Sequence, residues 1–206
     1  MFCFAQAVFR LQSTSIVFRV TETATRARAR KAIIEAGIAV LSQRPSATLG
    51  EIASAAGVGR TTLHRYFPER ADLMDAIGAD ALQKVADAMK RARLNDGPAL
   101  DAVARVCEEM YELGDLLMLV FADTNLMVDE RWQNETDADR DFYRLVERGH
   151  ADGSVHPDAP PRWAQTVLWA LLYAAWDHGR DSGESRHATL ARCVRTVRRA
   201  LAAPAS

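Results

Sequence analysis

Residues 48–67 carry the sequence TLGEIASAAGVGRTTLHRYF. Thr48 and Glu51 have the spacing of a capping box, in which each side chain accepts a hydrogen bond from the other residue's backbone N–H, and this predicts a helix that begins at Thr48. Gly57 can adopt the left-handed backbone conformation that ends a helix. The small side chains of Ala53 and Ala56 leave room for a second helix to cross closely. The stretch therefore predicts a helix-turn-helix.

The second helix of this pair has an apolar side and a polar side. Leu63 and Phe67 recur at helical spacing, so they are expected to face the core. Arg60, Thr61 and His64 then project outward. A recognition helix lies in the major groove, where an arginine can bond guanine through two hydrogen bonds and a threonine methyl can touch thymine. These three residues are therefore the expected base-reading set.

Basic residues gather in the same part of the chain. Residues 24–70 contain eight Lys or Arg against three Asp or Glu, a net charge of +5, whereas residues 71–206 carry −7. Arg26, Arg28 and Arg30 stand at the start of a predicted helix, where the helix dipole disfavours cations unless an anion is near. DNA phosphates would supply that anion, so Arg28 and Arg30 are expected to contact phosphate. The alternative is a helical hairpin with a solvated polar face, and the local charge excess argues against it.

This part of the chain resembles the N-terminal domain of the TetR family of transcriptional regulators. The family pattern runs Thr-x-x-x-Ile-Ala-x-x-Ala-Gly-Val-Ser-x-x-Thr-Leu-Tyr-x-Tyr-Phe-x-x-Lys, and it is matched here at Thr48, Ile52, Ala53, Ala56, Gly57, Val58, Thr62, Leu63, Tyr66 and Phe67. The resemblance covers residues 24–90 clearly, and the remainder only through length and helical order. Gly59 replaces the usual Ser, His64 the usual Tyr and Arg70 the usual Lys. The change at His64 makes the family's base preference hard to transfer.

The resemblance implies a homodimer with a three-helix DNA-binding head on each subunit, a fourth helix that links head to body, and repression that a small molecule relieves. It also implies phosphate contacts that set the register of binding, from Thr48, Thr62, Tyr66 and Arg70. The expected partners are a double-stranded operator and a small hydrophobic effector. A two-fold symmetric dimer is expected on a palindromic operator.

Helical periodicity runs through nearly the whole chain and predicts an all-α protein. Residues 24–70 are expected to form the helix-turn-helix domain, and residues 71–206 a helical domain for ligand binding and dimerisation. A long amphipathic helix is expected after Pro68, followed by helices near residues 98–113, 115–122, 129–149, 161–179 and 185–202. Residues 1–23, rich in Phe, Val and Ser, are interpreted as a disordered arm or a mis-assigned translation start.

Two surfaces are predicted in the C-terminal part. The helix at residues 162–179 is apolar on nearly every side, so it is expected to contact both its own core and a second subunit, with the last helix as its companion. The expected interface consists of Trp163, Val167, Leu171, Leu190, Val194, Val197 and Leu201. Flexible methionines and flat aromatic rings suit a hydrophobic guest, although they fill a core more often. The expected pocket residues are Met110, Tyr111, Met118, Phe121, Trp132, Phe142, Tyr143 and Tyr173.

The sequence carries no motif for catalysis, a metal or a cofactor, and none of these is expected. Cys3, Cys107 and Cys193 lack the paired spacing of a zinc site or a disulfide framework, which fits a reducing cytoplasm. No apolar run reaches the ~18 residues of a membrane span.

Two rival hypotheses remain: a small helical enzyme or ligand carrier, and a nonspecific architectural DNA protein. Salt-dependent binding to promoter DNA separates the first from a regulator, and footprinting separates the second.

Overall fold

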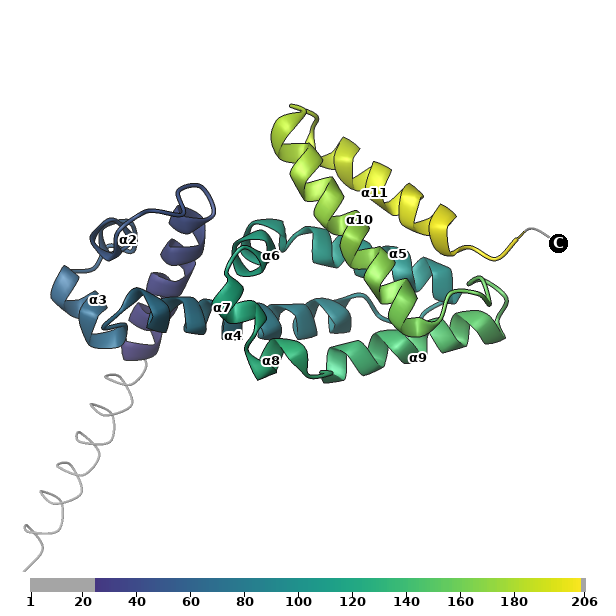
Figure 1. The fold of residues 1–206 in the computed structure, drawn as a ribbon, viewed down its shortest axis with the longest axis horizontal. Helices are drawn as coiled ribbons and strands as arrows, with labels where there is room; N and C mark the ends of the chain where they lie inside the picture. Colours follow the sequence, from purple (N-terminus) through teal and green to yellow (C-terminus); the bar gives the residue numbers. More distant parts are fainter. Residues whose placement is uncertain (1–24, 205–206) are drawn as a thin grey trace, which may run out of the picture. The chain divides into compact units, whose positions relative to one another are not determined.

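The computed structural model describes residues 25–204, so the expectation for residues 1–23 lies outside the described part. A first helix, without a label in Figure 1, covers residues 25–41. The labelled helices that follow are α2 (Leu49–Ala55), α3 (Arg60–Tyr66), α4 (Arg70–Arg91), α5 (Ala99–Tyr111), α6 (Gly114–Phe121), α7 (Thr124–Met127), α8 (Glu130–Gln133), α9 (Asp137–Ala151), α10 (Pro161–Asp181) and α11 (Arg186–Leu201). The described residues contain one isolated β-bridge, Val155 to Ala202, and no strand. The all-α expectation is confirmed.

The chain forms two compact units that divide between Ala76 and Ile77, inside α4. The sequence prediction placed the boundary between residues 70 and 71. Unit 1 contains the first helix, α2, α3 and the first turns of α4. Its core holds side chains from each of the first three helices, all 0% exposed: Ile33, Leu41, Ile52 and Leu63. These side chains fix how α2 and α3 cross, and so fix which side of α3 faces solvent.

Unit 2 contains the remainder of the chain, with α5 in contact with α9, α10 and α11 (Figure 1). The end of α9 approaches the start of α5 very closely, because a Cβ on Gly149 would lie 2.3 Å from Cγ2 of Val155 and 3.1 Å from Cβ of Ala99. The carboxylate of Asp152 accepts a hydrogen bond of 2.9 Å from the backbone N–H of Ala99. This bond satisfies one of the unpaired N–H groups at the N-terminus of α5.

The expectation of one helix over residues 129–149 is wrong. The structure has the four-residue α8, a break at residues 134–136, and then α9. The cause of the new start is a second capping box: Thr136 accepts from the Asp139 N–H, and Asp139 accepts from the Thr136 N–H at 2.7 Å. None of the helices that the structure describes is both long and apolar enough to cross a membrane.

Candidate nucleic-acid interface and internal cavity

Helix α2 begins at the predicted capping box. The backbone N–H of Thr48 donates to Oε2 of Glu51 at 2.7 Å, and the N–H of Glu51 donates to the Thr48 hydroxyl at 3.3 Å. Arg44 adds an ion pair to Oε1 of Glu51 at 2.7 Å, which ties the loop before α2 to its first turn. These three residues thus define where α2 starts, and the start of α2 defines where the turn and α3 follow.

The turn between α2 and α3 uses the residues that the sequence indicates. Gly57 has a φ of +67°, a left-handed conformation that side-chain-bearing residues rarely adopt. Gly59 is the N-cap of α3 and provides no side-chain hydrogen bond, in contrast to the serine of the family pattern. Leu63 is 0% exposed and Phe67 is 2% exposed, so both anchor α3 from behind as expected.

Arg60, Thr61 and His64 are all exposed on α3. The Arg60 side chain lies over Gly50 of α2, where an added Cβ would be 2.9 Å from its Nε. Nδ1 of His64 lies 3.2 Å from the carbonyl oxygen of Pro68. Because a carbonyl only accepts, Nδ1 carries the hydrogen, and Nε2 remains as the ring atom for another partner. The three side chains therefore share an exposed side of a short, well-anchored helix, which is the arrangement that base reading needs.

Several residues expected at DNA phosphates also have contacts inside unit 1. Arg70 donates from Nη1 to the carbonyl of Ala47 at 2.6 Å and from Nη2 to that of Pro45 at 2.5 Å, so it holds the loop before α2. The guanidinium of Arg30 stacks over the Phe67 ring, 5.4 Å from its centroid. The sequence did not indicate this structural role of Arg70. Phosphate contacts from Arg28, Arg30, Thr48, Thr62, Tyr66 and Arg70 stay predictions.

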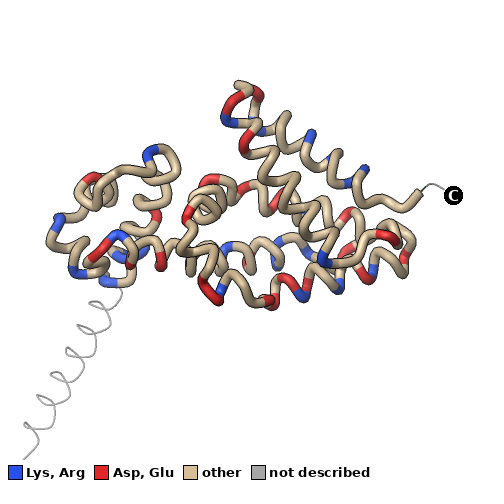
Figure 2. The backbone as a smooth tube through the Cα atoms, viewed as in Figure 1, with Lys and Arg blue, Asp and Glu red and all other residues tan. Residues whose placement is uncertain are grey.

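The charge of unit 1 follows the predicted pattern. Figure 2 shows Lys and Arg on the first helix and on α3. Among them, Arg28, Arg60 and Arg65 are exposed. Arg65 also lies over the ring of Tyr66, 5.5 Å from its centroid, which orients the end of α3. Exposed cations of this kind attract a polyanion and make its binding depend on salt.

The capping box makes the stability of unit 1 depend on pH. Hydrogen bonds from Thr48, and then from Arg44, lower the pKa of Glu51 from 4.5 to about 2. A carboxylate whose pKa is lower in the folded state stabilises the fold above its unfolded pKa, and the stabilisation is lost as the pH falls towards the folded value.

We therefore expect Glu51→Gln to lower the Tm of unit 1 by a few degrees at neutral pH, because the glutamine lacks the charge that both donors stabilise. The difference from the wild type should shrink as the pH falls from about 4.5 to about 2. Thermal unfolding followed by circular dichroism over that range measures it. A difference that stays constant down to the lowest pH would contradict the assignment.

Unit 2 contains a small internal cavity of about 20 Å³ between α4, α5, α9 and α10. Its walls are mostly apolar, and the lining residues are Val85, Met89, Val106, Met110, Ala138, Asp139, Phe142, Gln165, Leu168 and Trp169. A space of this size holds about one water molecule, so a larger guest has to displace side chains. Met89 and Met110 are flexible enough to move.

One wall of the cavity is polar. Gln165 of α10 donates to Oδ1 of Asp139 at 2.6 Å and accepts a hydrogen bond from the hydroxyl of Tyr143 at 3.0 Å. The other oxygen of Asp139 accepts from the N–H and the hydroxyl of Thr136. All these partners are neutral. Among the described residues no ion pair of 4 Å or less to Asp139 is found, and the charge of the neighbouring Arg140 acts on it from a longer distance.

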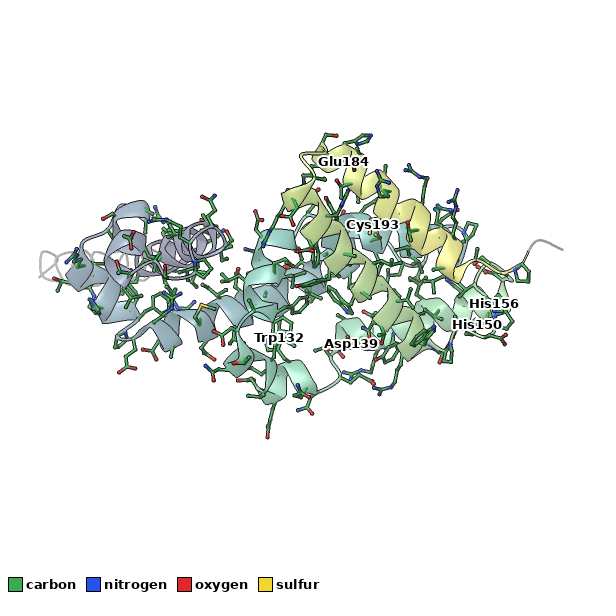
Figure 3. The ribbon with its side chains drawn as sticks, turned by 45° about the horizontal axis from the view of Figure 1, so that its top comes forward. Trp132, Asp139, His150, His156, Glu184 and Cys193 are labelled. Carbon is green, nitrogen blue, oxygen red and sulfur yellow. The ribbon has the colours of Figure 1, made fainter. Side chains whose placement is uncertain are left out.

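An aromatic cluster adjoins this wall. The ring of Phe121 packs edge-on against Trp132 at 6.4 Å and against Trp169 at 5.9 Å between centroids. Nε1 of Trp132 is buried and has no hydrogen-bond acceptor among the described residues. Figure 3 shows Trp132 on α8 and Asp139 on α9. A buried donor without an acceptor is costly, and an acceptor on a bound molecule would relieve that cost.

The structure places the predicted pocket residues in more than one region of unit 2. Met110 and Phe142 line the cavity, and Phe121 and Trp132 belong to the adjoining aromatic cluster. Tyr143 donates a hydrogen bond to Gln165, which lines the cavity. Tyr111 and Met118 instead line a separate surface pocket of about 260 Å³ beside Trp176. Tyr173 is 48% exposed, because it lies on the outer side of α10.

Sequence reasoning missed Asp139, Gln165 and Trp169. The sequence holds a signal for the first two of these residues. The Thr136-to-Asp139 spacing is that of a capping box, and Gln165 is a polar residue in an apolar stretch of α10. Both signals place polar groups near the cavity only once the packing of α9 on α10 is known.

Some residues of the predicted dimer interface are buried within unit 2, and others are exposed. Val197 and Leu201 of α11 are 0% and 1% exposed, so they pack inside unit 2 and are not available to a second subunit. Helical spacing alone does not tell which apolar side of α11 meets its own core. Trp163 of α10 is 59% exposed, and Val167, Leu171, Leu190 and Val194 are partly exposed. The available apolar surface is therefore on α10, with a smaller contribution from α11.

Comparison with known proteins gives consistent matches. The family model of bacterial regulatory proteins of the tetR family matches residues 33–77. The HTH-type transcriptional repressor LfrR of Mycolicibacterium smegmatis is 36% identical over 167 residues, which cover 81% of this chain and 86% of that protein. The HTH-type transcriptional regulator NfxB of Pseudomonas aeruginosa is 31% identical over 154 residues, with coverage of 72% and 81%.

A solved structure extends the match to the fold of most of the chain. The crystal structure of LfrR from Mycobacterium smegmatis in complex with proflavine has a TM-score of 0.71 and 34% sequence identity, and it covers 84% of this chain and 96% of that chain. The sequence identity and the coverage extend well beyond the helix-turn-helix. This chain belongs to the TetR family of bacterial transcriptional regulators, and it is a DNA-binding regulator and not an enzyme.

Proposed function

We propose that the protein is a homodimeric repressor that binds a palindromic operator and leaves it when an effector enters unit 2. The observation that carries the DNA-binding part is the exposed side of α3, where Arg60, Thr61 and His64 are held by the buried Leu63 and Phe67. Bases are read from such a side by direct hydrogen bonds, while cations elsewhere in unit 1 bind phosphate. The relative LfrR is a transcriptional repressor.

The first test separates base reading from general attraction to DNA. Arg60→Ala is expected to reduce the preference for operator over random duplex by about 1–3 kcal/mol, because it removes hydrogen bonds to a base edge. Fluorescence anisotropy with both duplexes at one salt concentration measures the two affinities. The fragment upstream of the protein's own gene is the first operator candidate.

The matched control is Arg93→Ala, which removes an exposed arginine from unit 2. It should leave both affinities nearly unchanged. If Arg60→Ala weakened binding to both duplexes by the same factor, Arg60 would be a phosphate ligand and would not read a base.

The effector is proposed to be a planar aromatic cation. LfrR has been crystallised with proflavine, a molecule of this class. Here the ring of Trp169, which packs edge-on against Phe121, lines the same cavity as Asp139, a carboxylate whose hydrogen-bond donors are all neutral. Aromatic faces attract cations, and a fixed carboxylate adds a charge partner. Because the cavity is about 20 Å³, binding requires rearrangement of its walls. That rearrangement is the proposed link between effector binding and DNA release.

Proflavine itself is the probe for this site. Asp139→Asn is expected to weaken its binding by roughly tenfold or more, because the ligand charge loses its partner. The fluorescence of proflavine during titration reports the affinity. Binding of acridine in its uncharged form should change much less, and this difference separates a lost charge from a damaged cavity.

Asp141→Asn provides the control on the same helix, since Asp141 pairs with Arg144 at 3.1 Å and does not line the cavity. It should bind proflavine as the wild type does. Equal losses for Asp139→Asn and Asp141→Asn would remove Asp139 from the proposed site.

A further inference from the structure

Two cysteines that are far apart in the sequence lie in contact inside unit 2. Cys107 of α5 and Cys193 of α11 are separated by 86 residues, and their Sγ atoms are 3.5 Å apart. Both are reduced in this structure and both are buried, at 0% and 4% exposure. Figure 3 shows Cys193 on the side of α11 that faces the body of unit 2. The pair therefore lies at a junction of two helices within unit 2.

We propose that Cys107 and Cys193 form an intramolecular disulfide when the protein meets a small two-electron oxidant such as hydrogen peroxide. A disulfide has an S–S length of about 2.05 Å, so the sulfur atoms have to approach by about 1.5 Å. This approach needs a rotation of the two side chains or a small shift of α5 and α11. Among the described residues these two are the free cysteines, and neither belongs to a cluster of three or more side chains that could hold a metal ion.

The chemistry starts at Cys193. The hydrogen bond to Cys193, followed by burial, raises the pKa of Cys107, and the same bond lowers the pKa of Cys193. The Cys193 sulfur attacks one peroxide oxygen, the O–O bond breaks, and hydroxide leaves and becomes water with the Cys193 proton. The Cys107 sulfur then attacks the sulfenic sulfur, the S–O bond breaks, and the hydroxyl leaves as water with the Cys107 proton. Two thiols and one peroxide give one disulfide and two waters.

The bond would join two helices with different surroundings. Val106 and Met110, on the same helix as Cys107, line the internal cavity. Cys193 lies 3.5 Å from the carbonyl oxygen of Leu171 on α10, and so at the contact of α11 with α10. The disulfide would therefore link α5, which lines the cavity, to α11 and its neighbour α10. The proposal rests on the geometry of the thiols and holds whether or not the proposed effector is correct.

The test uses the full-length chain with Cys3→Ser, so that only Cys107 and Cys193 can react. The protein is incubated with excess hydrogen peroxide, denatured, treated with N-ethylmaleimide and weighed as an intact chain. The expected product has lost two hydrogen atoms, carries no maleimide, and takes up two maleimides after reduction. Digestion should yield a peptide in which residues 107 and 193 are linked.

Cys107→Ala and Cys193→Ala in the same background are the controls, and each should keep one thiol and form no intramolecular disulfide. The linked peptide from the two-cysteine chain is sufficient evidence even if a control variant folds poorly. Two thiols that remain free after the treatment, sulfinic or sulfonic acids at both positions, or a disulfide between two chains would each overturn the proposal.

Discussion

Ala170→Glu is expected to convert the protein to a monomer and to weaken operator binding by roughly a hundredfold or more. Ala170 is exposed on α10, one helical turn from Tyr173 and two from Trp163, which are 48% and 59% exposed. Large aromatic side chains that are exposed on one helix indicate an interaction surface. A carboxylate placed between them would be buried without a partner in the proposed dimer, at a cost of several kcal/mol. A monomer also loses the gain in affinity that comes from binding two half-sites at once.

Sedimentation and operator binding should change together. Thr124→Glu is the matched control, because it adds the same charge at an exposed position at the start of α7, where the helix dipole tolerates it. It should remain a dimer and bind the operator normally. A wild type that sediments as a monomer at micromolar concentration, or an Ala170→Glu variant that remains dimeric, would contradict the proposed interface.

Leu63→Ala is expected to destabilise unit 1 by about 2–5 kcal/mol, the usual cost of truncating a fully buried leucine. Leu63 is 0% exposed and is the buried residue in the middle of α3. Without it, the side that carries Arg60, Thr61 and His64 loses its anchor. DNA binding should therefore fall even though no residue that faces DNA has changed.

Hydrogen exchange of the amides in α2 and α3 is the suitable measurement, because Trp132, Trp163, Trp169 and Trp176 all lie in unit 2 and their fluorescence reports on that unit. Exchange should speed up in both helices. Thr61→Ala, at an exposed position of the same helix, should leave exchange nearly unchanged while it weakens operator binding. Leu63→Ala with normal protection in α3 would show that α3 is anchored in another way.

Local signals in the sequence were sufficient for unit 1. The Thr48–Glu51 box, the left-handed Gly57 and the buried Leu63 all appear as predicted, because each is determined by residues within a few positions of it. Two contacts there could not be predicted. The approach of Arg60 to Gly50 and the bonds from Arg70 to the loop before α2 depend on how the helices cross.

Unit 2 was predicted less completely, because its helices have apolar residues on more than one side. Val197 and Leu201 proved to face their own core, while Tyr173 faces outward. The cavity is lined by residues from four helices. Asp139 can be recognised as part of it only from its hydrogen bond with Gln165 on another helix. The proximity of Cys107 and Cys193, across 86 residues, is likewise a product of tertiary packing.

The most direct test compares the affinity for operator with that for a scrambled duplex of the same length, in the wild type and in a variant that combines Arg60→Ala, Thr61→Ala and His64→Ala. The wild type should prefer the operator by roughly a thousandfold or more. The variant should lose nearly all of that preference, while its binding to both duplexes still falls linearly with the logarithm of salt concentration. A variant that keeps the wild-type preference would contradict the assignment of base reading to α3.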